Sequence, residues 1–347
     1  MAFDELEKMM ALIKDRTDLI KETRIKVTQI CNDTPRYMEE DVVELQDLEG
    51  KVTRAATMEE AKEYARQYKE RADNARLRPN APDRIYLWKE GNMPAETYYT
   101  DNSDFKFKHN PDFRPYLYEL LIPEYETPKG AVVVCAGGDH GTSVVKGYQV
   151  CRALNRRNYQ CVLLLNRPNH MPWNGHECGA DSARALRYVR ANAARLRIKE
   201  NNVAFAGFSN GGLTGEACIQ FYSGEKKVTD YFPDYVPDEL DSYYGGPDAF
   251  ICVYGPRFKG DDSFVWEGTV YPPVFYAIGR LDNAIDNFNF VYPDLLAHNV
   301  PVEVHTFAGV PHGQAGATIT KDGQQFPSFD LWEPLADYFL MDVFKEK

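Results

Sequence analysis

One serine stands in a context that favours nucleophilic catalysis. The segment Gly207-Phe208-Ser209-Asn210-Gly211 ends an apolar run, VAFAG, and leads directly into a helix-forming stretch. A serine in a sharp turn between a strand and a helix presents its hydroxyl outward, and glycines on both sides avoid collisions with the adjacent strand and helix. The pattern predicts that Ser209 is a nucleophile rather than an ordinary helix N-cap.

A serine hydroxyl needs a histidine that accepts its proton and an acid that orients that histidine. Where the nucleophilic serine occupies such a turn between a strand and a helix, the acid and then the histidine follow it along the chain. His312 follows the last alternating run, PVEVHTF, and meets this order. His305 lies within that run and His298 near a predicted helix end, and the remaining candidates precede the serine: His109, His170 and His176. His312 is therefore the predicted base.

Two aspartates, Asp282 and Asp286, follow the apolar run PPVFYAI and compete for the role of the acid. Asp282 comes three residues after Gly279, directly at the expected end of the strand. Asp286 is expected to enter the next helix, where it can serve as a cap. We favour Asp282. The three predicted residues then lie at the carboxyl ends of parallel strands, where open α/β sheets form their ligand crevice.

An acyl-transfer site also needs hydrogen-bond donors for the developing oxyanion. The backbone N–H of Asn210 supplies one. The glycine-rich turn after the run AVVVCA is expected to supply another, from Gly138 or Asp139. These glycines do not have the spacing of a dinucleotide-binding or P-loop motif.

Long aromatic segments are candidates for the substrate pocket, and they provide the predicted substrate-binding residues His140, Trp173, Tyr243, Tyr244 and Trp266. Packing of the loops explains the same aromatic residues equally well.

The elements that must position these residues follow a regular pattern. Short alternating segments at 84–89 and 116–123 are typical of an antiparallel sheet edge. From residue 130 onward the apolar runs AVVVCA, CVLLLN, VAFAG, AFICVY and PPVFYAI are each followed by a plausible helix, and PVEVHTF closes the series. This alternation predicts an α/β protein with a mostly parallel central sheet and helices on both faces. One crossover helix is expected at 180–196, with its apolar stripe separate from its arginines.

The N-terminal part differs in kind. Residues 59–78 are strongly helix-forming, and apolar residues recur at helical spacing over residues 3–20. We expect a helical extension over residues 1–80 and a catalytic domain over 81–347. The extension is expected to cover the active-site mouth as a cap or to form an interface between copies of the chain as a homo-oligomer.

Composition excludes several classes of function. The chain has 347 residues and a net charge of −12, which disfavours nucleic acid and anionic membranes as partners. The start shows no leader pattern and no apolar stretch approaches a bilayer span, so we expect a cytoplasmic protein. Seven cysteines without a CxxC motif are expected to be reduced and largely buried. His176 and Cys178 have metal-like spacing but no companion ligands, so we expect them to lie in an ordinary loop and predict no metal and no cofactor.

Residues 130–320 resemble the esterase/lipase branch of the α/β-hydrolase superfamily, particularly bacterial carboxylesterases related to carbohydrate-debranching esterases and hormone-sensitive-lipase-like enzymes. The segments that carry the resemblance are ADSARALRYVRANAARLRIKENNVAFAGFSNGG and AHNVPVEVHTFAGVPHG. Two features depart from the family pattern. Ala136-Gly137-Gly138-Asp139 replaces a histidine followed by glycines, and Asn210 stands where alanine or glutamate is frequent. The first 110 or so residues have no recognised counterpart.

The resemblance implies a serine carboxylesterase that acts on a small-molecule ester through an acyl-enzyme intermediate. It favours short acyl groups, among them acetyl or aromatic acyl groups on sugars. A peptidase or amidase similar to prolyl oligopeptidase shares the serine turn and the order of the three residues, but the N-terminal part lacks the repeats of its propeller. The third alternative is a binding protein with this fold and no catalytic activity.

Overall fold

The computed structural model describes residues 30, 32–94, 113–138, 142–167, 175–259, 264–315 and 325–345, with a few isolated positions between 11 and 19. Most of the helix predicted over residues 3–20 lies outside this range. Three predicted site residues also lie outside it: Asp139, His140 and Trp173.

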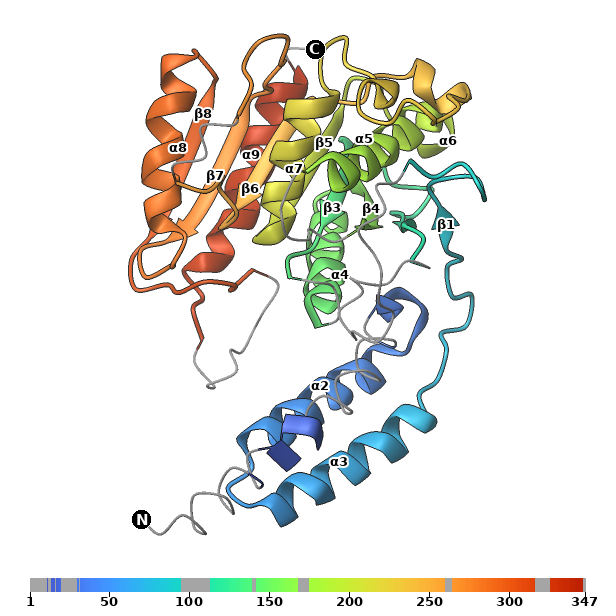
Figure 1. Ribbon diagram of the computed structural model, residues 1–347, viewed down its shortest axis with the longest axis vertical. Helices are drawn as coiled ribbons and strands as arrows, with labels where there is room; N and C mark the ends of the chain where they lie inside the picture. Colours follow the sequence, from blue (N-terminus) through green and yellow to red (C-terminus); the bar gives the residue numbers. More distant parts are fainter. Residues whose placement is uncertain are drawn as a thin grey trace.

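A sheet with the strand order β1-β2-β4-β3-β5-β6-β7-β8 forms the centre of the described structure (Figure 1). The strands are β1 (Ile85–Tyr86), β2 (Tyr116–Leu120), β3 (Gly130–Cys135), β4 (Tyr159–Leu165), β5 (Val203–Phe208), β6 (Ala249–Val253), β7 (Val274–Gly279) and β8 (Val302–Phe307). The pairs β1–β2 and β2–β4 are antiparallel, and the other five pairs are parallel. The predicted antiparallel edge and parallel body are both confirmed.

The apolar runs form strands because the sheet is covered on both faces. Every residue of β3, β4, β5, β6 and β7 is buried, as expected for parallel strands between two helical layers. The strand β8 lies at the edge, and most of its residues are only partly buried. Its polar and apolar residues alternate accordingly.

Alternate side chains of the strands identify the two helical layers. On β4, Tyr159 contacts Phe344 of α9 (Trp332–Lys345), and Leu163 lies against Gly147 of α4 (Thr142–Asn155), so α4 and α9 cover one face. On β7, the Tyr276 ring packs against Phe288 of α8 (Ile285–Ala297). The neighbouring Phe275 points the other way, to α9. The helix α8 therefore covers the opposite face, together with α7 (Asn210–Tyr222) and α5 (His176–Ala191).

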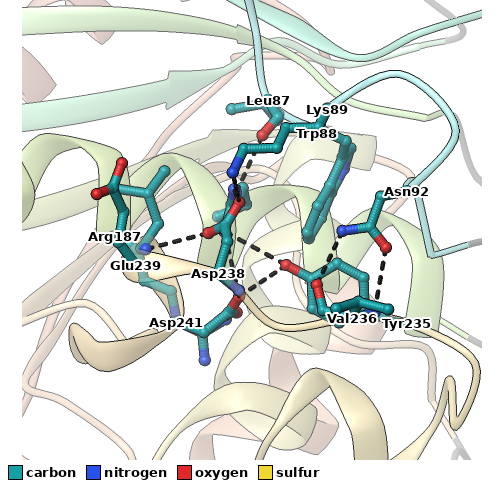
Figure 2. A network of polar contacts seen from close by, with 12 residues as sticks. Leu87, Trp88, Lys89, Asn92, Arg187, Tyr235, Val236, Asp238, Glu239 and Asp241 are labelled. Atoms are coloured by element: carbon teal, nitrogen blue, oxygen red, sulfur yellow. Dashed lines mark hydrogen bonds and ion pairs between the residues drawn. The ribbon is translucent and has the colours of Figure 1, made fainter.

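Arginines of α5 are buried in ion pairs rather than solvated. Arg184 donates hydrogen bonds to Asp238 at 2.6 and 2.7 Å, and these bonds lower the pKa of Asp238. Arg187 donates to Asp241 at 3.0 Å. Figure 2 shows the same network reaching the segment after β1, where the Asn92 side chain exchanges two hydrogen bonds with the Val236 backbone. The network fixes residues 87–92 and 235–241 to α5.

Two details differ from the sequence prediction. The helix expected at 180–196 begins at His176 and is divided into α5 and a short α6 (Ala193–Leu196). His176 and Cys178 thus lie in a helix, not in a loop. The run AFICVY was expected to precede a helix, but the described residues between β6 and β7 form none. Rings pack this connection instead, with Trp266 stacked on His298 at a centroid distance of 3.8 Å.

The N-terminal helices α2 (Glu39–Arg54) and α3 (Met58–Asp73) lie side by side below the sheet in Figure 1. We call this pair the helical hairpin. Thr57 and Glu60 form a capping box that begins α3. A small apolar cluster, separate from the main core, joins the hairpin to α4: Ile30, Val42, Leu45, Leu48, Tyr68 and Val145. An N-terminal helical extension is therefore present, and it packs against the body through α4.

Among the described helices, none combines the length and the hydropathy that a membrane span requires.

Candidate active site

Ser209 sits in the sharp turn that the sequence predicts. It joins β5 to α7 with φ 54° and ψ −121°, a strained backbone conformation for a residue with a side chain. A Cβ on Gly207 would lie 2.3 Å from the carbonyl oxygen of Gly211, and one on Gly211 would lie 2.2 Å from that of Cys135. The glycines on both sides are therefore required by close backbone contacts. The turn leaves the Ser209 side chain at the carboxyl edge of the sheet.

A continuous chain of hydrogen bonds runs from this serine to a buried carboxylate. Ser209 Oγ lies 2.8 Å from His312 Nε2. His312 Nδ1 lies 2.9 and 3.0 Å from the two carboxylate oxygens of Asp282. With Nδ1 facing the carboxylate, the proton of the neutral imidazole belongs on Nδ1, and Nε2 is left to accept the serine proton. The backbone N–H of Ala284 donates to Asp282 Oδ1 at 2.7 Å and helps to hold the carboxylate in place.

The end of β7 brings the acid and the histidine loop together. A Cβ on Gly279 would lie 2.0 Å from the Val310 carbonyl oxygen, so only glycine permits this approach. The Leu281 N–H then donates to that same carbonyl at 3.0 Å. The competing aspartate, Asp286, is exposed in the first turn of α8. Of the two aspartates, only Asp282 contacts His312.

The turn after β3 lies directly against the serine. A Cβ on Gly137 would come within 2.7 Å of the Ser209 Cβ. Asn210 begins α7, and its side-chain amide donates to the Gly138 carbonyl at 3.1 Å. This bond ties the residue after the serine to the turn from which oxyanion donors are expected. Asn210 thus has a structural role that the resemblance did not indicate.

A cavity of about 200 Å³ opens beside the serine. Small and apolar residues dominate its described lining, which comprises Ala136, Gly137, Gly138, Lys146, Gly147, Val150, Phe208, Ser209, Tyr254, His312, Gly313 and Ala315. Lys146 of α4 reaches across to the histidine loop, where its ammonium donates to the Gly313 carbonyl at 2.5 Å. The helix that packs against the hairpin therefore also contacts the residue next to His312.

Sequence reasoning missed two residues of this site, Lys146 and Tyr254. Tyr254 directly follows β6, beside the serine strand β5, and its position at a strand's carboxyl end was the one signal that could have identified it. Lys146 lies within a helix and carried no such signal.

Three of the aromatic residues proposed for substrate binding lie elsewhere. The backbone carbonyls of Tyr243 and Tyr244 accept hydrogen bonds from Arg187 and Arg190 on α5. Trp266 lies in the connection between β6 and β7, where its ring stacks on His298. None of the three belongs to the described lining of the cavity beside Ser209.

The described cysteines do not offer a second reactive centre. Each of them is buried and unpaired: Cys135, Cys151, Cys161, Cys178, Cys218 and Cys252. Burial raises the pKa of the Cys135 thiol to about 12, and it also raises the pKa of Cys151, Cys178, Cys218 and Cys252, so these thiols stay protonated and weakly nucleophilic. Among the residues with described positions, no group of three or more histidine, cysteine or carboxylate side chains could hold a metal ion.

Comparison with known proteins identifies solved structures of the same architecture. A bifunctional acetyl ester-xyloside hydrolase from Caldicellulosiruptor lactoaceticus is 21% identical, with a TM-score of 0.54 over 76% of this chain and 96% of that one. A thermophilic esterase from Thermogutta terrifontis, solved with propionate bound, is 16% identical, with a TM-score of 0.53 over 76% and 94%. An alpha/beta hydrolase from a Medee basin deep-sea metagenome library is 16% identical, with a TM-score of 0.51 over 76% and 98%.

No family model matches the sequence, and no curated protein matches it either. At these identities the likeness concerns the fold. It spans nearly the whole length of each solved neighbour and about three quarters of this chain.

Proposed function

Because this chain has the α/β-hydrolase fold, we propose that it is a serine hydrolase that cleaves carboxylic esters through an acyl-enzyme intermediate. The observation that carries the proposal is the hydrogen-bond chain Ser209–His312–Asp282, because it joins a nucleophile, a base and a buried acid in one line. Three strand ends of the sheet supply these residues, and the cavity opens beside the serine.

The reaction follows from the geometry. Ser209 Oγ attacks the acyl carbon while His312 Nε2 takes its proton, and the imidazolium then gives this proton to the leaving alcohol. Asp282 stabilises the imidazolium and keeps Nδ1 oriented. In the second half, His312 removes a proton from water, which attacks the acyl-enzyme and releases the carboxylic acid. No cofactor takes part in these steps.

Backbone N–H groups stabilise the oxyanion of each tetrahedral intermediate. We assign one to Asn210, whose amide begins α7, and the other to the turn of Gly138 and Asp139. The bond from the Asn210 side chain to the Gly138 carbonyl supports this assignment, because it holds the turn beside the serine.

We further propose that the acyl group is short, from acetyl to butyryl. The cavity of about 200 Å³, with glycine and alanine on its walls, has room for a small acyl chain. Forms of the Thermogutta esterase have been solved with propionate and with butyrate bound, and the Caldicellulosiruptor hydrolase acts on an acetyl ester. The same esterase is phosphorylated by paraoxon, the chemistry expected of an activated serine.

Replacing the nucleophile tests the proposal. Ser209→Ala is expected to lower kcat for para-nitrophenyl acetate by roughly 10⁴-fold or more, since the hydroxyl that forms the acyl-enzyme is gone. A fluorophosphonate probe should label the parent enzyme at Ser209 and leave Ser209→Ala unlabelled. Across acetyl, butyryl and octanoyl esters, kcat/KM is expected to fall at octanoyl.

The matched control is Ser242→Ala, which removes an exposed serine hydroxyl outside the cavity and should keep full activity. Unchanged hydrolysis by Ser209→Ala would refute the serine mechanism. A preference for peptide amides over esters would make the chain a peptidase instead, and failure of the probe to label the folded parent would leave a binding protein.

A further inference from the structure

An aromatic side chain outside the hydrogen-bond chain contacts the histidine directly. The Tyr254 ring lies 4.9 Å from the His312 imidazole, centroid to centroid, in an edge arrangement with an interplanar angle of 62°. Tyr254 is only 4% exposed, and its ring also packs against Phe208, which precedes the nucleophile, and Phe329. The ring therefore bridges the serine turn and the histidine.

The histidine loop has contacts on two sides. The Tyr254 ring lies on one side, and burial keeps the pKa of its phenol above the usual range, so the side chain stays neutral. On the other side, Lys146 of α4 donates a hydrogen bond to the Gly313 carbonyl. The imidazole of His312 and the backbone next to it therefore each have a contact that holds them.

The backbone at this position is strained. Tyr254 has φ 43°, a left-handed conformation that glycine adopts at less cost than a tyrosine. Its amide donates to the Ala277 carbonyl of β7 at 2.9 Å, so the conformation is anchored between two strands. A bulky aromatic residue that keeps a strained backbone at the carboxyl end of a strand indicates that its side chain has a role whose benefit exceeds the cost of the strain.

We propose that Tyr254 is a positioning residue for His312: its ring holds the imidazole in line with Ser209 and Asp282 during acyl transfer. This inference rests on the proposed function and deepens it. Without the ring the imidazole can tilt away from Ser209 Oγ, and a small misplacement of a catalytic group lowers the rate. Proton transfer depends on this alignment more than substrate binding does, so loss of the ring should lower kcat more than it changes KM.

The test compares Tyr254→Phe, which keeps the ring, with Tyr254→Leu, which keeps most of the apolar volume without it. Tyr254→Leu is expected to lower kcat for para-nitrophenyl acetate about tenfold, with little change in KM. Tyr254→Phe should restore kcat to within about threefold of the parent. Tyr188→Leu is the matched control, because it removes a half-buried tyrosine of α5 that lies outside the site.

A second readout needs no substrate. The proton shared by His312 Nδ1 and Asp282 should give a far-downfield proton NMR signal in the resting parent enzyme and in Tyr254→Phe. This signal should broaden or vanish in Tyr254→Leu. Thermal unfolding shows whether Tyr254→Leu is folded, and Tyr254→Met takes its place if it is not.

Two results would overturn the inference: a folded variant without the ring that keeps both kcat and the downfield signal, or equal losses in Tyr254→Phe and Tyr254→Leu. Either result leaves the proposed esterase activity intact. Failure of that activity appears separately, as unchanged hydrolysis by Ser209→Ala.

Discussion

At the scale of single residues, the site depends on which of two nearby carboxylates faces the histidine. Asp282 is 2% exposed and contacts His312 Nδ1 with both oxygens, whereas Asp286 is exposed on α8. A buried carboxylate at Nδ1 fixes the imidazole tautomer, and an amide in its place can present an N–H to Nδ1 and favour the wrong one. The two positions can therefore be separated by experiment.

Asp282→Asn is expected to lower kcat for para-nitrophenyl acetate by roughly 10³–10⁴-fold, because the wrong tautomer cannot accept the serine proton. Asp286→Asn is the matched control and should retain kcat within about twofold. Steady-state kinetics on both purified variants decide the point. Comparable losses in the two variants, or a loss confined to Asp286→Asn, would contradict the assignment of Asp282 as the acid.

Sequence could identify residues that a local pattern or their place along the chain marks. Ser209 is marked by the glycines around it, which the close backbone contacts of Gly207 and Gly211 explain. Asp282 was preferred over Asp286 by its position after the strand, and the structure supplies the physical reason, the contact of two loops made through Gly279 and Val310. Lys146 and Tyr254 meet the histidine loop only in the folded chain, where the end of a strand is the one signal for Tyr254 and no pattern marks Lys146.

At the scale of elements, α4 connects the helical hairpin to the cavity. Val145 is 3% exposed within the hairpin cluster, and the next residue, Lys146, lines the cavity and holds the histidine loop. One turn further along α4, the Tyr148 hydroxyl accepts a hydrogen bond from Arg78, which follows the hairpin. Packing of the hairpin on one side of α4 therefore helps to set the position of the cavity wall on the other.

Val145→Ala tests this connection. It should lower the free energy of unfolding by about 2 kcal/mol, because it opens a cavity in the cluster. It should also lower kcat/KM several-fold, since Lys146 loses support against the histidine loop. Val52→Ala is the matched control: Val52 is 1% exposed on α2 but does not belong to that cluster. A Val145→Ala variant that loses stability but keeps the kcat/KM of the parent would show that the hairpin does not influence the site.

The strands were predictable because parallel strands covered on both faces consist of apolar runs with clear ends. The helix α5 shows where that reasoning stops. Its apolar stripe was predicted, but the burial of Arg184 and Arg187 depends on Asp238 and Asp241, which come more than 50 residues later and reach α5 only in the folded chain. A helix was expected between β6 and β7 because predicted strands and helices alternate along the rest of the sequence. In the described residues of this connection, packed aromatic rings take the place of that helix.

At the scale of the whole molecule, two apolar clusters of unequal size divide the described structure. The large one surrounds the sheet, and the small one belongs to the hairpin and Val145. The hairpin also depends on a buried charge. Asp41 of α2 is fully buried and accepts hydrogen bonds from the Arg76 backbone and side chain at 2.7 and 2.9 Å, and it pairs with Arg71. A small cluster with a buried carboxylate is expected to be the acid-sensitive part of the molecule.

The direction of this sensitivity follows from the pKa of Asp41. Hydrogen bonds from the Arg76 side chain lower the pKa of Asp41 to about 2, against the opposing effect of burial. A depressed carboxyl pKa stabilises the folded state at pH values above the unfolded pKa near 4, and this stabilisation is lost as the pH falls through about 2. The contribution is about 1–2 kcal/mol, a range that allows for the solvent exposure of Arg76.

Two probes separate the hairpin from the body in urea unfolding. All four tryptophans lie outside the hairpin, at positions 88, 173, 266 and 332, so their fluorescence reports on the body, whereas far-ultraviolet circular dichroism also includes α2 and α3. Between pH 6 and pH 3, the urea midpoint of the parent measured by circular dichroism should fall more than the midpoint measured by fluorescence. Asp41→Asn should lower the circular-dichroism midpoint at pH 6 and weaken the dependence of that midpoint on pH.

Asp47→Asn is the matched control on the same helix. Its carboxylate forms an exposed pair with Lys51, which contributes little to stability, so the transitions should follow those of the parent. If Asp41→Asn kept the pH dependence of the parent, the acid-sensitive group would lie elsewhere. Because the hairpin packs against α4, Asp41→Asn should also lower kcat/KM for para-nitrophenyl acetate at pH 6, whereas Asp47→Asn should leave it unchanged.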